Sequence, residues 1–401
     1  MKLEVQKSKV DGAISVPGSK SHTIRAVAVA AMAKGVSHIR GPLLSDDTVS
    51  ATLAAKAFGA KVERGDDSEW IIEGAGGIIQ QPGKTMDMGN SGTSLRIFSG
   101  LASLAEFPID FDGDDSLRTR PMGILLSALE QLGAKCSSAN GKCPLRITGP
   151  IKGGHAEFEG KSSQFVTAVL FAAPLCKADT SIKVFKLNEV PYVEITLDWL
   201  AKQGIKLEHS ADLSEYKIKG GQSYKPFAMT IPADFSTATF PLVAAAITGG
   251  RVEIRNLDFS DRQGDKATFD YLARMGAKIE RGENSTIVSG SGTLRGVELD
   301  LNATPDALPA MAIAAACAKG RPILGNVPQA RIKETDRIAC MTKELRKMGV
   351  KVDELPDGMV IEGGTLHGAE VESYKDHRIA MSMALAGMCA KGKTIIADSE
   401  C

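Results

Sequence analysis

Six runs of small apolar residues recur along the chain, and each follows a Ser or an Asp. They begin at Ser21, Ser91, Ser162, Ser236, Asp306 and Asp376, with gaps of 70, 71, 74, 70 and 70 residues between successive starts. Because Ala, Gly and Val lie on every side of such a run, it is typical of a helix that is buried all round. The regular spacing indicates one supersecondary unit that is copied six times.

A second, amphipathic helix follows each of the first five runs. Apolar residues recur at i, i+3 and i+4 in segments such as LLSALEQLGAKC and FDYLARMGAKI. A glycine suited to ending a helix closes each segment, at Gly59, Gly133, Gly204, Gly276 and Gly349. Two short strands around a turn come next, as in AKVERGDDSEWIIEG. The pattern therefore predicts an α/β (α+β) fold of six βαβαββ repeats.

Six repeats of this size are too many for one core, so we expect two domains of three repeats each. The segment 220–232, which carries Gly and Pro, separates repeats three and four. The strand expected at 2–6 precedes repeat one and would complete the sheet of the second domain, with a second crossing near 11–18. We thus predict one domain over 14–226 and another over 1–13 and 227–401. The next stopping glycine would fall beyond Cys401, so the sixth repeat is expected to be incomplete.

Composition narrows the functional classes. Lys plus Arg and Asp plus Glu both number 48, so no net field favours nucleic acid or an anionic membrane. Seven Cys form no CxxC pair and no metal-binding spacing with His, which argues against a zinc site and favours reduced thiols. Neither a secretory signal nor an apolar run long enough to cross a bilayer is expected. These features predict a cytoplasmic protein, and we also expect a monomer.

Several predicted helix starts carry cations, although the helix dipole places partial positive charge there. Lys20, Arg25, Arg96 and Arg378 lie in such first turns, and nearby loops add Arg118, Arg120, Lys333 and Arg337. Cations beside a positive helix end indicate that anions bind between them. The alternative is that each cation reaches solvent or pairs with a local carboxylate.

Hydroxyl and amide groups accompany these cations, at Ser19, Ser21, Ser162, Ser163 and Gln164. The serines could equally be ordinary N-caps. Gly92, in GNSGTSLR, is either a turn residue or a place where a ligand approaches the backbone. Neither GSKS (18–21) nor GKS (160–162) has the leading Gly of a phosphate-binding P-loop, which disfavours ATP-driven chemistry.

Taken together, these residues resemble the 5-enolpyruvylshikimate-3-phosphate (EPSP) synthase family. The resemblance runs from about residue 3 to 401, and its most specific segments are RIKETDR (331–337) and DHRIAMS (376–382). It is also carried by VPGSKSHTIRA (16–26), GNSGTSLR (89–96), GDDSLRTRPM (113–122), SSQF (162–165) and PDA (305–307). The family has two domains of three βαβαββ repeats, with helix N-termini facing a cleft between them. Its reaction transfers the enolpyruvyl group of phosphoenolpyruvate to the 5-hydroxyl of shikimate 3-phosphate and releases phosphate, without metal or organic cofactor.

The resemblance also implies roles for individual residues. Shikimate 3-phosphate would be held by Lys20, Ser21, Arg25, Ser162, Ser163, Gln164, Tyr192, Asp306, Gln329 and Lys333. Phosphoenolpyruvate would be held by Lys20, Asn90, Gly92, Arg120, Gln164, Arg337 and Arg378. Asp306 would accept the proton of the 5-hydroxyl, Glu334 would act as acid and base near the enol carbon, and Lys20 would assist catalysis. Because glyphosate-tolerant members often carry a bulkier residue at the position of Gly92, glyphosate is an expected inhibitor.

The chain departs from the family pattern at three places. Glu189 stands where a Ser usually precedes the Pro-Tyr of repeat three, and an acid beside an anionic substrate is unfavourable, so we leave it outside the site. Gln329 stands where many members have Asn. The family also continues past ADSEC with a helix and a Lys that contacts phosphoenolpyruvate, and without this segment weaker activity is expected.

Two alternatives remain open at this stage. UDP-N-acetylglucosamine enolpyruvyl transferase shares the fold, but it uses a Cys in the loop that here reads GDDSLRT. A non-catalytic anion-binding repeat scaffold would need neither Asp306 nor Glu334 among the cations.

Overall fold

The computed structural model describes residues 1–401 except 66–67, 283–284 and 292. By its internal contacts, the chain divides into a first unit, Pro17–Pro232, and a second unit, Met1–Val16 with Ala233–Cys401. Hydrogen bonds mark the change of unit: Val16 N–H donates to Asn256 of the second unit over 2.9 Å, and Ser19 N–H donates to Pro232 O of the first over 2.8 Å. The boundaries expected from the sequence, after residues 13 and 226, lie a few residues earlier in the chain.

All six predicted small-residue helices are present. They are α1 (Lys20–Met32), α3 (Gly92–Ala102), α5 (Ser163–Ala172), α7 (Phe235–Thr248), α9 (Leu308–Ala316) and α11 (His377–Cys389). Repeat five starts differently from the expectation of a helix from Asp306. A 3-10 turn, η4 (Pro305–Ala307), comes first, and α9 begins after it. In α1 every residue from His22 to Met32 is buried, as the all-round small-residue pattern predicts.

The five amphipathic helices are also present, and their predicted ends are confirmed. They are α2 (Asp46–Ala57), α4 (Gly123–Gln131), α6 (Val190–Lys202), α8 (Ala267–Met275) and α10 (Arg337–Lys347). The five stopping glycines all have positive φ, from +71° at Gly204 to +108° at Gly133. Only glycine adopts this left-handed conformation without steric cost, which is why each helix ends there.

Each complete repeat forms a four-stranded sheet in which the first two strands are parallel and the last two form an antiparallel hairpin. Repeat two gives the order β6-β7-β9-β8, repeat three β10-β11-β13-β12 and repeat five β19-β21-β23-β22. Their bounds are β6 (Met86–Asp87), β7 (Pro108–Asp112), β8 (Lys135–Ala139), β9 (Lys142–Thr148), β10 (Gly154–Glu159), β11 (Thr180–Phe185), β12 (Leu207–His209), β13 (Glu215–Ile218), β19 (Glu298–Asp300), β21 (Ile323–Gly325), β22 (Lys351–Leu355) and β23 (Gly358–Glu362). Two further short strands, β18 (Leu294–Arg295) and β20 (Ala318–Lys319), pair with each other.

Repeats one and four exchange their first strands. β2 (Asp11–Ser15) precedes α1 in the sequence but pairs with β15 (Arg251–Arg255) of repeat four. Conversely, β14 (Ala228–Thr230) precedes α7 but pairs with β3 (Lys34–Arg40) of repeat one. The hairpins that complete these sheets are β4 (Lys61–Arg64) with β5 (Glu69–Ala75), and β16 (Lys278–Arg281) with β17 (Ser285–Ser289). A boundary after residue 226 would leave β14 in the second unit, whereas its pairing with β3 keeps it in the first.

The sheet of repeat six is completed by the start of the chain. β24 (Glu370–Glu372) and β25 (Thr394–Ala397) are parallel, and β1 (Lys2–Val5) pairs antiparallel with β25. The strand predicted at 2–6 therefore lies in the second unit, in the place that the last strand takes in other repeats. Repeat six has no second helix in the described residues.

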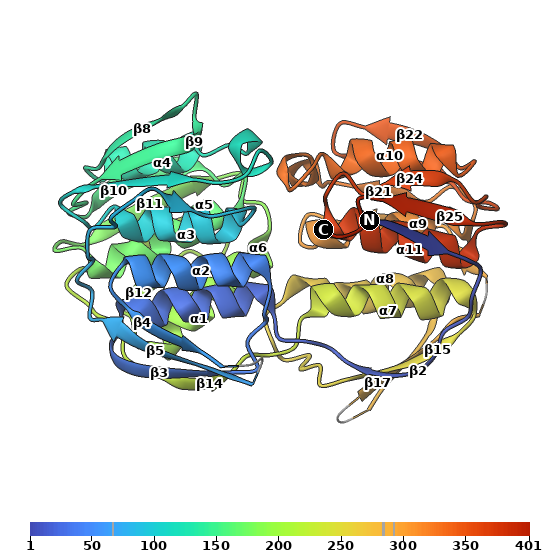
Figure 1. The fold of residues 1–401 in the computed structure, drawn as a ribbon, viewed down its shortest axis with the longest axis horizontal. Coiled ribbons are helices and arrows are strands. Elements are labelled where there is room, and N and C mark those ends of the chain that lie inside the picture. Colours follow the sequence, from blue (N-terminus) through green and yellow to red (C-terminus); the bar gives the residue numbers. More distant parts are fainter. Residues whose placement is uncertain (66–67, 283–284, 292) are drawn as a thin grey trace. The chain divides into compact units, whose positions relative to one another are not determined.

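In each unit the small-residue helices are largely buried, and the sheets lie outside them (Figure 1). The sheets follow an alternating pattern of buried and exposed residues, as in β9, where Cys143, Leu145 and Ile147 are buried. None of the helices in the described residues combines the length and the apolar character that crossing a membrane requires.

We predict that Gly100→Ala destabilises the fold. Gly100 lies on α3 against α5, and a Cβ there would come within 2.3 Å of the backbone oxygen of Ala168. Because the obstacle is backbone, the two helices must separate, at a cost of about 1–3 kcal/mol. Urea unfolding measures this, with Gly83→Ala as control, since nothing lies within 4 Å of a Cβ at Gly83. Equal unfolding midpoints for the two variants would contradict the close approach of α3 and α5.

Candidate functional site

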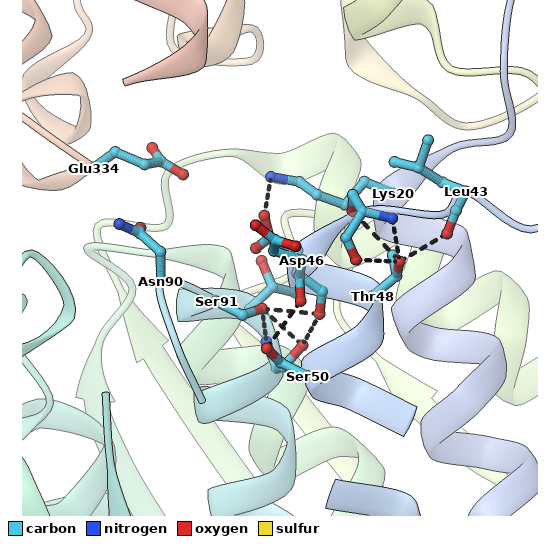
Figure 2. Close-up of polar contacts among 12 residues, drawn as sticks. Lys20, Leu43, Asp46, Thr48, Ser50, Asn90, Ser91 and Glu334 are labelled. Carbon is cyan, nitrogen blue, oxygen red and sulfur yellow. Dashed lines mark hydrogen bonds and ion pairs between the residues drawn. The ribbon is translucent and has the colours of Figure 1, made fainter. Parts of the chain in front are cut away.

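In the first unit, polar contacts link the N-termini of α1, α2 and α3. The ammonium of Lys20, at the start of α1, lies 3.7 Å from the carboxylate of Asp47 in the first turn of α2 (Figure 2). The backbone oxygen of Asp47 accepts hydrogen bonds from Ser91 Oγ at 3.3 Å and Ser94 Oγ at 2.9 Å. The start of α2 is itself fixed by Thr48, whose hydroxyl donates to Leu43 O over 2.7 Å. Lys20 is thus oriented by the carboxylate of Asp47, which is not among the predicted site residues.

The glycine that begins α3 lets two guanidinium groups approach the helix end. A Cβ at Gly92 would lie 2.8 Å from Nη1 of Arg120 and 3.1 Å from Nη1 of Arg96. Its backbone is not in the left-handed region, so the need is for space rather than for a special conformation. Both arginines are buried, and within the described residues the Nε atom of Arg120 has no hydrogen-bond partner. The space beside Gly92 is taken by these two guanidinium groups, and the approach of a ligand to its backbone stays a prediction.

The two arginines of the GDDSLRTRPM loop differ in their surroundings. Arg120 donates to the side-chain oxygen of Asn90, whose amide nitrogen donates to Asp114 over 2.7 Å. Arg118 instead makes a two-pronged ion pair with Asp112, at 2.9 and 2.7 Å, and is half exposed. For Arg118 the alternative explanation, pairing with a local carboxylate, therefore holds.

Gln164 and Arg96 join α5 to α3. Arg96 Nη1 donates to Gln164 Oε1 over 2.5 Å, and its guanidinium lies 5.2 Å from the ring centroid of Phe165. The Gln164 amide nitrogen donates to Thr93 Oγ1 over 3.0 Å. Arg96, which lies outside the residue set implied by the family resemblance, thus fixes the orientation of a residue within that set.

Ser162 and Ser163 are at the N-terminus of α5, and the carboxylate of Glu189 binds there. Ser162 Oγ accepts from Gln164 N–H over 3.3 Å, which is an N-cap bond. Glu189 Oε2 accepts from Ser163 Oγ at 2.8 Å, from Ser163 N–H at 3.0 Å and from Ser162 Oγ at 3.3 Å. Glu189 thus lies against two of the predicted site residues, where the helix end and two hydroxyls are favourable partners for its charge. That it stays out of the substrate site remains a prediction.

Arg25 is a buried cation whose described partners are neutral oxygens. It is 1% exposed, and it donates to Thr196 Oγ1 at 3.1 Å, Thr167 Oγ1 at 3.3 Å, Ser21 O at 3.0 Å and Tyr192 O at 2.9 Å. Burial lowers the pKa of the Arg25 guanidinium to about 10, so it stays charged at neutral pH. Its contact with Tyr192, in the first turn of α6, links α1 to α6.

In the second unit, Asp306 lies among three cations. Its carboxylate is 2.8 Å from Arg337 Nη1, 3.4 Å from Arg378 Nη2 and 3.7 Å from Lys333 Nζ. Burial raises the pKa of Asp306, but Arg378, Lys333 and Arg337 lower it by more, so the pKa lies well below its usual range. Asp306 is therefore ionised at neutral pH.

Arg337, the first residue of α10, connects three carboxylates. Besides Asp306, it contacts Glu334 at 2.6 Å and Asp376, the N-cap of α11, at 2.8 Å. The guanidinium is 1% exposed and Asp376 is fully buried. Burial lowers the pKa of Arg337, and Asp376, Glu334 and Asp306 raise it by more, so the charge is permanent. Asp376 was recognised in the sequence only as a helix start.

Arg378 brings repeat four into this cluster. Its Nη1 donates to Ser236 Oγ of α7 over 2.7 Å, and Asp376 accepts a bond from its backbone N–H. Repeat four therefore contacts the charged cluster through Ser236. Asp234, rather than Ser236, is the N-cap of α7.

Gln329 is buried on the 3-10 turn η5 (Pro328–Ile332), which directly precedes Lys333 in the chain. Its amide nitrogen donates to Asn302 O over 2.8 Å, while its side-chain oxygen is buried without a hydrogen-bond partner in the described residues.

The predicted site residues are divided between the two units. The first unit contains Lys20, Ser21, Arg25, Asn90, Gly92, Arg120, Ser162, Ser163, Gln164 and Tyr192, and the second contains Asp306, Gln329, Lys333, Glu334, Arg337 and Arg378.

We predict that Asp306→Asn flattens the acid dependence of stability. Because the pKa of Asp306 is lower in the folded protein than in the unfolded chain, its contribution is complete above about pH 3.9 and is lost as the pH falls toward the folded pKa. The wild type should lose up to about 1.4 kcal/mol more per pH unit than the variant below pH 4. Urea unfolding between pH 4 and 3 measures the two slopes. Identical slopes would show that the three cations do not hold this carboxyl ionised.

Comparisons with known proteins give matches over almost the whole chain. The model of the family described as EPSP synthase (3-phosphoshikimate 1-carboxyvinyltransferase) matches residues 5–401. A 3-phosphoshikimate 1-carboxyvinyltransferase of Ruminiclostridium cellulolyticum is 48% identical over 402 residues, which cover 100% of this chain and 94% of that protein. One of Methanocella arvoryzae is 44% identical, with 100% and 95% covered. The solved EPSP synthase of Acinetobacter baumannii superposes with a TM-score of 0.82 at 30% identity, covering 100% of this chain and 94% of that one. The chain therefore belongs to the EPSP synthase family.

Proposed function

We propose that this protein transfers the enolpyruvyl group of phosphoenolpyruvate to the 5-hydroxyl of shikimate 3-phosphate and releases phosphate, as a step of the shikimate pathway toward aromatic amino acids. The observation that carries the proposal is the pairing of buried cations with helix N-termini in one unit, and of two carboxylates with cations in the other. The substrates bring two phosphates and two carboxylates. Buried cations at positive helix ends are suited to such ligands.

In the first unit, each substrate is assigned to particular helix N-termini. Shikimate 3-phosphate is assigned to the α1 and α5 ends, with Lys20, Ser21, Arg25, Ser162, Ser163, Gln164 and Tyr192. Phosphoenolpyruvate is assigned to the α3 end, with Asn90, Gly92 and Arg120, and shares Lys20 and Gln164. The unsatisfied Nε of Arg120 and the neutral partners of Arg25 support this assignment, because both cations gain most from a bound anion.

In the second unit, Asp306, Gln329 and Lys333 are assigned to shikimate 3-phosphate, and Arg337 and Arg378 to phosphoenolpyruvate. Without ligands, Asp306 is a weak base because three cations lower its pKa. Anionic substrates that draw Arg378 and Lys333 toward themselves would raise that pKa and restore its basicity. Substrate binding and activation of the base are thereby coupled.

The chemistry then needs one base, one acid and positive charge. Asp306 accepts the proton of the 5-hydroxyl, and Glu334 delivers a proton to C3 of phosphoenolpyruvate, which makes C2 electrophilic. The hydroxyl oxygen adds to C2 and gives a tetrahedral intermediate, with Lys20 beside the developing charge. The tetrahedral intermediate then loses phosphate, and Glu334 takes a proton back from C3, which restores the enol double bond. The 5-hydroxyl proton held by Asp306 is released with the phosphate. Each acid or base group raises the reaction rate by about 10²–10⁴-fold.

The proposal also covers localisation, oligomeric state, cofactors and inhibition. We infer that the enzyme works as a cytoplasmic monomer without a cofactor, and that glyphosate competes with phosphoenolpyruvate. The even charge balance, with 48 basic and 48 acidic residues, supports a small-molecule enzyme over a nucleic-acid or membrane partner.

The test is phosphate release from shikimate 3-phosphate and phosphoenolpyruvate. The wild type should release phosphate, and Asp306→Ala should lower kcat by about 10²–10⁴-fold. UDP-N-acetylglucosamine in place of shikimate 3-phosphate should give no release. Turnover with the nucleotide sugar alone, or none with either acceptor, would refute the proposal.

A second prediction concerns Gly92. Gly92→Ala places a methyl group 2.8 Å from Arg120 Nη1, so the guanidinium must shift. The KM for phosphoenolpyruvate should rise about tenfold and inhibition by glyphosate should weaken, since one misplaced charged contact costs about 1.4 kcal/mol. The KM for shikimate 3-phosphate should stay within about twofold and serves as the internal control. A parallel rise in both constants would indicate general distortion instead.

A further inference from the structure

The carboxylate of Glu189 accepts hydrogen bonds from the donors at the start of α5. The residue is 1% exposed, and one oxygen accepts bonds from Ser163 Oγ at 2.8 Å, Ser163 N–H at 3.0 Å and Ser162 Oγ at 3.3 Å. Two hydroxyls and a helix N-terminal amide are also a donor set that binds a phosphate oxygen. The protein therefore holds an anion of its own at this helix end.

The backbone of Glu189 presents the carboxylate to α5. Glu189 is the N-cap of α6, with φ +58° and ψ +40°, and Pro191 lies in the first turn of that helix. A left-handed conformation is unfavourable for a non-glycine residue and persists only where the surroundings support it. Here the support is the triple contact with Ser162 and Ser163, so the turn and the ion contact depend on each other.

The same turn is tied to the buried cation of α1. Arg25 donates to the backbone oxygen of Tyr192, three residues after Glu189, over 2.9 Å. A ligand that binds both at Arg25 and at the start of α5 therefore meets the Glu189 turn. A phosphate entering there meets like charge at donors that are already in use, which is unfavourable.

We propose that Glu189 is a built-in competitor for the phosphate of shikimate 3-phosphate and sets the affinity for that substrate. This inference rests on the proposed function, which assigns that phosphate to Ser162 and Ser163. For the phosphate to bind, the side chain must leave these donors or take up a proton, and part of the binding free energy is spent on that change. Phosphoenolpyruvate, which is assigned to the α3 end, is not affected.

Isothermal titration with shikimate 3-phosphate alone tests the inference on the wild type, Glu189→Gln and Glu189→Asp. Gln keeps the shape and removes the charge, so the Kd for shikimate 3-phosphate should fall about tenfold. Asp keeps the charge, so its Kd should stay close to the wild-type value. Steady-state kinetics should show the same split in KM for this substrate, with the KM for phosphoenolpyruvate unchanged. Glu189→Ser is a second neutral variant, expected to gain affinity as Gln does, in case Gln folds poorly.

Glu344→Gln is the matched control. Glu344 is also a fully buried carboxylate, but it contacts Tyr374 and the backbone N–H of Glu372 instead of the predicted site. Removing the charge of Glu344 should leave the Kd for shikimate 3-phosphate unchanged. If the neutral Glu189 variants bind this substrate no better than the wild type, Glu189 only joins α5 to α6 and the inference is overturned. Because titration needs no turnover, that result differs from an absence of phosphate release, which would overturn the proposed function.

Discussion

The close approach of helix backbones is the constraint on which the rest of each unit depends. At Gly100 of α3 there is no room for even one methyl group, because Ala168 of α5 presents its carbonyl there. Gly74 of β5 is similar, since a Cβ there would come within 2.1 Å of Ala30 O on α1. Helices packed this tightly bring neighbouring N-termini within reach of one another's side chains. Lys20 can therefore contact Asp47, and Arg96 can contact Gln164, across helix boundaries.

Gathering positive helix ends and cations in one place is costly unless negative charge is supplied. The second unit supplies it through Asp306, Glu334 and Asp376, all bonded to Arg337. The first unit supplies it more sparingly, through Asp47 and Glu189. The resting protein is thus partly neutralised by its own carboxylates. On the proposed function, an anionic substrate would exchange partners with these carboxylates, so that recognition would be a competition between charged groups.

Much of the fold could be predicted from the sequence because its signals are local. Helix type follows from residue size and periodicity, and helix ends follow from glycines such as Gly133, whose φ of +108° no other residue adopts easily. The exchange of β2 and β14 could not be predicted, because strand pairing depends on which edge is free and not on the strand's own residues.

The candidate site divides in the same way. Cations at helix starts could be recognised, since they contradict the ordinary charge preference of a helix. Their partners could not: Asp47 looks like an ordinary first-turn acid, and Asp376 like an ordinary N-cap. The position of Glu189 against Ser162 and Ser163 could not be predicted, because from the sequence only its charge is visible. The two hydroxyls and the amide that bind it become visible only in three dimensions.

The exchanged strands have a consequence for synthesis on the ribosome. β2 ends at Ser15, yet its partner β15 begins only at Arg251. At about 5–20 residues per second, the N-terminal segment waits on the order of 10–50 s before it can pair. The first unit, by contrast, has all its strands once Pro232 has emerged. Vectorial folding therefore favours the first unit, while an early strand edge stays open and needs protection from wrong partners.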